Sequence, residues 1–363
     1  AIASQNADVV IEGESAGDLF GASIARADVN NDGQDDILVG APAAGVNKEG
    51  RTYIFLGRTN SDPVLSATQA ETMLSGSQPA GRLGHAVASA GDVNADGYQD
   101  VLVGARDVDI DANIDDNTGQ AYVFFGSKDG VANCNLAAAN CAATTITGET
   151  ATAKLGNSVA SAGDMNSDGY DDVIIGSYLA NGAKKGQAYV LLGSAVGTAN
   201  CNLFEKTCVP AVTITGGVDD WLGTIVSPAG DINADGYDDV LVSADVAGSD
   251  GQGQVYIFLG GANLDKRFLT PAQDAFMTIT GKNYYSLFGN TGAVAGIGDI
   301  NNDGYADFLA GAPFLDNWTG IGQVYLFLGS DKAQNCELSL AGSCRPQATW
   351  TGEAEGDWFD SVE

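Results

Sequence analysis

Residues 231–239 read Asp-Ile-Asn-Ala-Asp-Gly-Tyr-Asp-Asp, and the chain repeats this stretch with small variations. Oxygen-bearing side chains occupy its first, third, fifth and ninth positions, which are Asp231, Asn233, Asp235 and Asp239. Alternate spacing on a curled loop directs the oxygens toward one point, and Gly236 permits the sharp bend that a β-carbon would resist. With the backbone carbonyl of Tyr237, these are the hard oxygen ligands that Ca²⁺ prefers. The stretch therefore predicts a calcium loop, although a single Asx-Gly run is also an ordinary turn.

Five copies of the pattern favour calcium over five unrelated turns. Successive copies begin 64, 72, 67 and 68 residues after the one before. Each supplies oxygens at positions one, three and five, a backbone carbonyl at position seven and a closing aspartate at position nine. We therefore expect about five Ca²⁺ sites. The predicted ligands are Asp28, Asn30, Asp32, Gln34 and Asp36; Asp92, Asn94, Asp96, Tyr98 and Asp100; Asp164, Asn166, Asp168, Tyr170 and Asp172; Asp231, Asn233, Asp235, Tyr237 and Asp239; and Asp299, Asn301, Asp303, Tyr305 and Asp307.

The composition is that of a globular, acidic protein. Hydrophobic residues make up 44% of the 363 residues and charged residues 17%, enough to bury a large core. Asp and Glu total 47 against 16 Lys and Arg, which gives a formal net charge of −31. Nucleic acids and anionic membranes need clustered Lys and Arg, so this balance argues against both partners. No apolar run is long enough to span a membrane. We interpret the acidity as a solvated surface, with a high-salt habitat as the alternative.

The six cysteines form three close pairs, each at the same place in its repeat. This regularity predicts three local disulfides: Cys134 with Cys141, Cys201 with Cys208, and Cys336 with Cys344. Each would contribute about 2.5 kcal/mol by restricting the unfolded chain. Zinc binding is disfavoured because no CxxC spacing occurs and the chain has one histidine. Disulfides together with calcium predict an extracellular or cell-surface location.

Each repeat is predicted to form four β-strands. In the third copy they are Leu155–Gly163, Asp172–Gly176, Gly186–Gly193 and Ala211–Gly216, which are short apolar or β-branched runs between Gly and Asp clusters. Helical turns are expected at most within Pro63–Leu74 and Thr270–Ala275. Repeated four-stranded antiparallel units are typical of β-propeller blades. We therefore predict an all-β fold, a single propeller domain over residues 1–363. Its repeats are approximately 14–76, 77–148, 149–216, 217–281 and 282–352, with a partial sixth over 353–363.

Each repeat also carries short motifs around the loop. In the first copy these are Leu19-Phe-Gly21, Gly40-Ala-Pro42 and the strand Thr52–Gly57. With the calcium loop, they resemble the FG-GAP repeat of integrin α-subunit propellers and their bacterial relatives. The resemblance covers nearly all of the chain and implies an adhesion or ligand-binding module. The middle copies depart from the Gly-Ala-Pro triplet, with Gly104-Ala-Arg106, Gly176-Ser-Tyr178 and Ser243-Ala-Asp245.

The two ends of the chain do not match each other. Val9–Gly13 resembles the fourth strand of a blade that lacks its other three, and Glu353–Val362 resembles the start of a sixth repeat. In an integrin-like arrangement the first strand completes the last blade. We therefore expect a fragment of a longer protein, with seven blades in the complete ring. A smaller closed ring is one alternative, and completion of the open edge by a neighbouring molecule is another.

The two faces of such a propeller have different predicted roles. The calcium loops and the disulfide segments should share one face, and the opposite face resembles the ligand-binding side of integrins. The acidic loop over residues 106–117 is a solvated loop, a sixth cation site or a ligand-binding loop. Aromatic side chains there either stack on a sugar or a partner protein, or pack between blades. The candidates for this face are Arg106, Asp107, Asp109, Asp111, Trp221 and Trp318, and the further aromatics are Tyr178, Tyr284, Tyr285 and Trp358.

The sequence predicts no catalytic site. His85 is the one histidine, and other repeats place Ala22, Asn157 and Thr224 at its position, which favours a tolerated variant over a general base. Nucleophilic schemes need a placed partner that no motif provides. Paired carboxylates for glycoside hydrolysis stay an open alternative, because 47 acidic residues always offer pairs.

Three functions follow, in order of preference. The first is a secreted or cell-surface, calcium-stabilised propeller that binds an extracellular protein or glycan. The second is a structural subunit of an extracellular assembly, with self-association through edge strands. The third is a polysaccharide lyase or hydrolase, because calcium-supported polysaccharide lyases also use propellers.

Overall fold

The computed structural model describes residues 9–57, 64–110, 116–138, 141–264, 267–283, 286–290, 294–314, 321–332, 334–339 and 346–352. This part of the chain is almost entirely β-strand. Its helical elements are a single 3₁₀ turn, η2 (Ala67–Gln69), and the four-residue α1 (Pro271–Asp274). Both lie inside the two segments in which the sequence allowed a helical turn.

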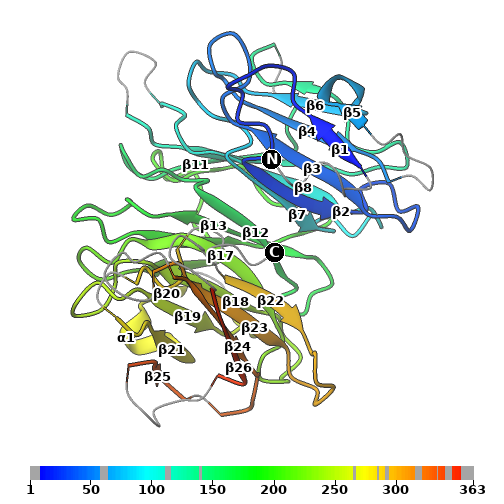
Figure 1. Ribbon diagram of the computed structural model, residues 1–363. Coiled ribbons are helices and arrows are strands. Elements are labelled where there is room, and N and C mark those ends of the chain that lie inside the picture. Colours follow the sequence, from blue (N-terminus) through cyan, green and yellow to red (C-terminus); the bar gives the residue numbers. More distant parts are fainter. Residues whose placement is uncertain are drawn as a thin grey trace.

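Five antiparallel sheets of four strands follow one another along the described chain as the blades of a β-propeller (Figure 1). The predicted fold class is therefore confirmed. Blade 1 contains β2 (Ser23–Ala27), β3 (Asp36–Ala41), β4 (Arg51–Phe55) and β6 (Thr72–Ser75); blade 2 contains β7 (Ala86–Gly91), β8 (Asp100–Ala105), β9 (Gln120–Phe124) and β11 (Thr144–Thr147); blade 3 contains β12 (Ser158–Gly163), β13 (Asp172–Ser177), β14 (Gln187–Leu191) and β16 (Val212–Thr215); blade 4 contains β17 (Leu222–Gly230), β18 (Asp239–Ala244), β19 (Gln254–Phe258) and β21 (Met277–Thr280); and blade 5 contains β22 (Val294–Gly298), β23 (Asp307–Ala312), β24 (Gln323–Phe327) and β26 (Ala348–Thr351).

Four blades gain a fifth, parallel strand that the sequence did not reveal. Each comes from the segment between the third and fourth strands of the next blade, so it links two blades. The pairs are β10 (Cys134–Asn135) with β6, β15 (Cys201–Asn202) with β11, β20 (Arg267–Leu269) with β16, and β25 (Cys336–Glu337) with β21. At the amino-terminal end, β1 (Val10–Glu12) and β5 (Val64–Ser66) pair in the same parallel way. A strand of two or three residues is too short to show a hydrophobic period.

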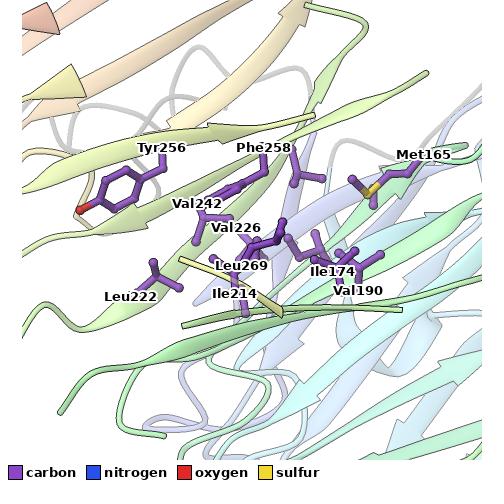
Figure 2. Packing of buried hydrophobic residues seen from close by; sticks show 14 of the residues in the cluster. Met165, Ile174, Val190, Ile214, Leu222, Val226, Val242, Tyr256, Phe258 and Leu269 are labelled. Carbon is purple, nitrogen blue, oxygen red and sulfur yellow. The ribbon is translucent and has the colours of Figure 1, made fainter. Parts of the chain in front are cut away.

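The hydrophobic core lies between successive blades. Figure 2 shows the cluster between blades 3 and 4, where Ile174 and Val190 of one sheet face Val226, Val242 and Phe258 of the next. Equivalent clusters separate the other neighbouring pairs of blades. The second strands of blades 2, 3 and 4 are covered on both faces, and every residue of β8, β13 and β18 is buried. Burial of each large aliphatic side chain contributes about 1.5–3 kcal/mol.

Paired glycines let the blades approach closely. The amide of Gly156 donates to the carbonyl of Gly176 within blade 3, while a β-carbon at Gly104 of blade 2 would overlap the carbonyl oxygen of Gly156. The same relation joins Gly40 to Gly84 one blade earlier. These are the first glycine of the Gly-Ala-Pro motif in one blade and the glycine before the first strand of the next. The glycines of the two motifs therefore mark the places where the backbones of neighbouring blades come into contact.

The innermost strands follow the order of the chain. β2 packs on β7, β7 on β12, β12 on β17 and β17 on β22. In the orientation of Figure 1, blades 1 and 2 lie above and blades 4 and 5 below. No extensive contact joins β22 back to β2 among the described residues. The number of blades in a complete ring stays a prediction.

Candidate functional site

All five predicted calcium loops connect the first and second strands of a blade. In blade 4 the loop begins at the end of β17, and its closing residue Asp239 is the first residue of β18. Residues at the fourth position adopt a left-handed backbone in every copy, with φ between 53° and 59°. The glycine at position six also has positive φ, between 82° and 93°. These turns reverse the chain within a few residues and bring the oxygen-bearing side chains over the loop.

The loop side chains accept hydrogen bonds from the loop backbone. Asp231 Oδ1 accepts from the amide of Asp235 at 3.0 Å, and its Oδ2 accepts from Gly236 at 2.8 Å. Asn233 Oδ1 accepts from the same Asp235 amide at 3.1 Å. Corresponding bonds occur in the other four copies. The loops therefore share one conformation, which the side chains of positions one and three help to hold.

The closing aspartate is buried and ties two strands together. Asp239 is fully buried; its Oδ2 accepts from Ile232 at 2.9 Å, and its Oδ1 accepts from Gly260 at 2.8 Å, just beyond the third strand. Burial raises the pKa of Asp239 to about 7, against the lowering effect of these two amide bonds. The equivalent Asp100 and Asp172 have a pKa raised to about 7 for the same reason. These carboxyl groups are structural ties as well as predicted ligands.

The chemistry of the donor set fits a hard divalent cation. Each loop offers only oxygen donors, and every accepting oxygen keeps a second lone pair. Clustered carboxylates also need neutralisation, because like charges at close range oppose one another. No group of three or more His, Cys, Asp or Glu side chains in the described ranges is itself arranged to hold a metal ion. The calcium sites therefore remain a prediction that rests on donor chemistry and repetition.

Position eight of the second, third and fourth loops links neighbouring blades, which sequence reasoning missed. The carboxylate of Asp171 accepts from the amide of Asp92 at 2.7 Å, and that of Asp238 accepts from Asp164 at 2.9 Å. Gln99 makes the equivalent bond to the amide of Asp28 at 3.1 Å. Each bond runs to the first ligand position of the preceding loop. The polar residue at position eight was a signal in the sequence, but its partner lies in another repeat.

The disulfide segments lie on the same face of the propeller as the predicted calcium loops. The bonds Cys134–Cys141 and Cys201–Cys208 are both present. Cys336 is also disulfide-bonded, and its predicted partner Cys344 lies outside the described residues. The amides of Ser127 and Ser194, which begin these segments, donate to carbonyls of the preceding blade's loop at 3.0 Å. The shared face is therefore held by loops, disulfides and linking strands together.

A depression of about 680 Å³ lies among the turns of the opposite face. Its lining comes from blades 1 to 5, chiefly from the residues that begin the first strand of each blade and those that follow the second. Arg106 and Trp221, both predicted for this face, line it together with Tyr178. The Tyr178 and Trp221 rings lie 5.9 Å apart, and the Lys184 ammonium lies 5.4 Å from the Trp221 ring centre.

Polar groups of the depression form one network. Arg106 Nη1 lies 3.0 Å from His85 Nε2 and donates to Asn157 Oδ1 at 3.0 Å. Because a guanidinium only donates, His85 Nε2 accepts, so the imidazole is neutral with its proton on Nδ1. Burial and the Arg106 charge lower the pKa of His85 to about 4, in agreement with this state. In blade 4, buried Asp245 accepts from Thr224 Oγ1 at 2.9 Å and from Asn290 Nδ2.

The remaining predicted face residues are placed as follows. Asp107 accepts from Arg82 at 2.9 Å and from Lys154 at 2.6 Å. Asp109 accepts from the amide of Asn117, which fastens its own loop. The structure therefore gives Asp107 and Asp109 partners within the protein. Asp111, Trp318, Tyr284, Tyr285 and Trp358 lie outside the described residues.

A family model described as FG-GAP repeat matches this chain five times. The matched residues are 20–55, 83–124, 155–191, 222–258 and 291–327, which are more than half of the chain. Each match begins no more than three residues before a blade's first strand and ends at the last residue of its third strand. Within the described ranges, no helix is both long and apolar enough to cross a membrane.

Curated relatives are similar over about half of the chain. Integrin alpha-IIb of Mus musculus is 33% identical over 186 residues, which are 49% of this chain and 16% of that protein. Integrin alpha pat-2 of Caenorhabditis briggsae is 35% identical over 211 residues, 53% of this chain and 16% of that protein. Phosphatidylinositol-glycan-specific phospholipase D of Bos taurus is 35% identical over 177 residues, 47% of this chain and 20% of that protein. The aligned regions are therefore a small part of each relative.

Proposed function

The chain belongs to the FG-GAP repeat family, and from that premise we propose that it is an extracellular ligand-binding module of the adhesion type, stabilised by calcium. The integrin names of its relatives support an adhesion role. The observation that carries the proposal is the division between the two faces. One face repeats the same loop five times, whereas the other has a depression whose lining differs from blade to blade.

Calcium would be held by the loop oxygens. In blade 4 these are the side chains of Asp231, Asn233 and Asp235 with the carbonyl of Tyr237, and Asp239 supports them from below. A bound divalent cation supplies charge neutralisation and cross-links the loop. The chain's own contribution is to fix the donors, through the amide bonds to Asp231 and Asn233.

An extracellular location is supported by the disulfides. Cys134–Cys141 and Cys201–Cys208 would persist only where the redox environment is oxidising. Calcium concentrations outside cells also suit loops whose affinity lies in the range of roughly 10⁻⁴–10⁻³ M that extracellular modules show. The location and the calcium requirement therefore support each other.

The test is binding to immobilised extracellular proteins and glycans by the purified protein. Binding is measured in calcium and again after chelation with EGTA, on an array that includes matrix proteins and neutral and acidic glycans. We expect selective binding that is lost on chelation. No binding to any member of the array, with the protein folded in calcium, would overturn the proposal.

The alternatives from the sequence have separate tests. Light scattering in calcium distinguishes a monomer from an assembly subunit, and long or repeating particles would favour the subunit. The phospholipase relative carries no argument for catalysis, because the aligned region is 20% of that protein. Turnover of any glycan on the same array would instead favour an enzyme.

A further inference from the structure

The depression coincides with the departures from the family motif. Blades 1 and 5 keep the proline of the Gly-Ala-Pro triplet, as buried Pro42 and Pro313. In the three blades between them the proline is replaced by Arg106, Tyr178 and Asp245, and all three replacements line the depression. A second variable position follows the glycine that begins each blade, and it lines the same depression with Ala22, His85, Asn157, Thr224 and Asn290. The blades share one backbone structure, and the two positions at which their sequences differ both line the depression.

In the described part of the chain, Arg106 has one ion pair, a long contact with Asp107 that it shares with two other cations. Asp107 is the nearest carboxylate, but its two oxygens receive Arg82 at 2.9 Å and Lys154 at 2.6 Å. Arg106 Nε is 3.7 Å from Asp107 and makes no hydrogen bond. Its Nη1 is used by His85 and Asn157, and no described residue accepts from Nη2. Three cations therefore surround one carboxylate, which leaves a local excess of positive charge.

Unused donors and an aromatic surface adjoin this charge. The Tyr178 hydroxyl and the Trp221 indole N–H have no hydrogen-bond partner among the described residues. Both side chains are partly exposed, so a ligand can reach them. The two rings are inclined at 58° to each other, so they form a corner rather than a stack. Trp221 stands at a left-handed position, φ 59°, that Leu19 and Leu287 occupy in other blades. The backbone holds this side chain at the rim whatever its identity.

The blade 4 side of the depression presents one carboxylate, Asp245. Both oxygens of Asp245 accept hydrogen bonds, from Thr224 and Asn290, and its side chain is buried. The Asn157 amide donates to the carbonyl of Thr224 at 2.9 Å, so its groups are also satisfied. The groups left for a ligand are thus mostly donors. They require a ligand rich in acceptors, with a negative charge beside an apolar face.

We propose that this depression binds a short uronate-containing oligosaccharide. Its carboxylate meets Arg106, and the C–H face of a sugar ring lies on the corner of Tyr178 and Trp221. A sugar ring offers the apolar face, the acceptors and the carboxylate within one small unit, which the volume of the depression accommodates. The formal net charge of −31 opposes long polyanions, so short chains bind best. This inference rests on the proposed ligand-binding function and names the ligand class.

The experiment is calorimetric titration of the calcium-loaded protein with trimers of galacturonate, mannuronate and glucuronate. The fully methyl-esterified galacturonate trimer is the matched ligand, because it keeps the rings and hydroxyls but lacks the charges. We expect at least one acid trimer to bind and the ester to bind about tenfold or more weakly. Equal binding of acid and ester, or no binding of any trimer, overturns the inference.

Two variants test the two halves of the site. Arg106→Gln removes the charge, and we expect about tenfold or greater weakening toward the acid trimer. Trp221→Leu uses a side chain that the same backbone position carries in blades 1 and 5, and we expect about fivefold to tenfold weakening. Lys128→Gln is the control, because Lys128 is exposed between the third and fourth strands, on the face of the loops. Unchanged affinity in Trp221→Leu, which tests the site independently of Arg106, also overturns the inference.

The outcomes separate this inference from the proposed function. If matrix proteins bind in calcium but no uronate trimer does, the adhesion module stands and the ligand class is wrong. If a peptide containing aspartate binds, Arg106→Gln weakens that binding and no trimer binds, the site takes a protein partner instead. If nothing on the array binds, both proposals fail.

Discussion

The ninth residue of each predicted calcium loop differs in burial from the other oxygen positions. Asp100 is fully buried and accepts from the amides of Val93 at 3.0 Å and Gly126 at 2.9 Å, whereas Asp96 is exposed. The sequence pattern placed both in one ligand set. Because Asp100 is buried and Asp96 is exposed, we expect Asp100 to stabilise the fold with or without calcium and Asp96 to stabilise it mainly when a cation is bound.

Asp100→Ala and Asp96→Ala should therefore separate structure from calcium binding. The first leaves two buried amides without acceptors, and we expect a loss of about 3 kcal/mol or more both in calcium and in EGTA. The second should cost less than about 1 kcal/mol in EGTA but should reduce the stabilisation that calcium provides. Urea denaturation at pH 8 measures both. Equal effects of the two substitutions under chelation would contradict the distinction.

His85 gives the protein a pH dependence of known sign. Its pKa falls to about 4 in the folded protein from an ordinary value of 6.5, because burial and Arg106 oppose the imidazolium. The unfolded chain thus takes up a proton near pH 6.5 and the folded protein only near pH 4. Stability from this residue is present above pH 6.5 and is lost as the pH falls toward 4, by up to about 3 kcal/mol.

His85→Gln provides the comparison, because glutamine keeps an acceptor for Arg106 and does not titrate. Denaturation at pH 7, 5.5 and 4 should show a steeper loss in the natural protein than in the variant. Buried carboxyl groups such as Asp172 have raised pKa values and act in the opposite direction in the absence of calcium. They are common to both proteins, so the difference isolates His85. Parallel pH profiles would show that its imidazole is not held neutral.

At the scale of elements, contacts between blades depend on backbone approach as well as on side-chain packing. Gly104 in β8 has no room for a β-carbon, because the carbonyl of Gly156 in the next blade occupies that space. Blade 4 has Ser243 at the equivalent position, and its hydroxyl accepts from the amide of Ile225 at 3.0 Å. The glycine is therefore a requirement of particular blade pairs rather than of the strand itself.

Gly104→Ala should destabilise the protein by about 3 kcal/mol, because the overlap is with a backbone atom that cannot rotate away. Gly81→Ala is the matched control, since a β-carbon there would come no closer than 3.1 Å, to a methyl group of Val108. We expect the control to cost less than about 1 kcal/mol. Thermal or urea unfolding in calcium measures both. A small effect of Gly104→Ala would mean that blades 2 and 3 can separate slightly without loss.

The linking strands also act at this scale. β10 and β15 each contain a cysteine and extend the sheet of the preceding blade. The disulfide closes a short loop, and the strand that it holds fastens two blades. A disulfide within one repeat therefore helps to hold two neighbouring blades together. The spacing of the cysteines alone did not reveal this.

For the whole molecule, calcium should set the thermal stability. Five loops gather acidic side chains on one face, and chelation leaves their charges without a counter-ion. At millimolar calcium we expect the melting temperature to exceed that in EGTA by on the order of 10 °C. Calorimetry in calcium, in magnesium and in EGTA measures this, and magnesium should replace calcium poorly because it demands strict octahedral geometry. Identical melting temperatures in all three would refute the calcium assignment.

The sequence by itself determined the repeat, the strand order and the set of loop oxygens. Those features are local, because turn chemistry, strand propensity and ligand spacing act within some nine to sixty residues and recur five times. The local disulfides Cys134–Cys141 and Cys201–Cys208 were predictable for the same reason. The third residue of the Gly-Ala-Pro triplet also varies among the repeats. From the sequence alone, this variation indicated only that the middle repeats match the family motif less well.

Only the tertiary structure decided what lies between repeats. It paired β10 with β6, bonded Asp171 to the loop of the preceding blade, and brought Arg106, Tyr178 and Asp245 to one depression. These residues are far apart in the chain and come together because each blade packs on the next with its first strand innermost. Contacts of that kind depend on the geometry of stacked sheets, which no periodicity within a single repeat encodes.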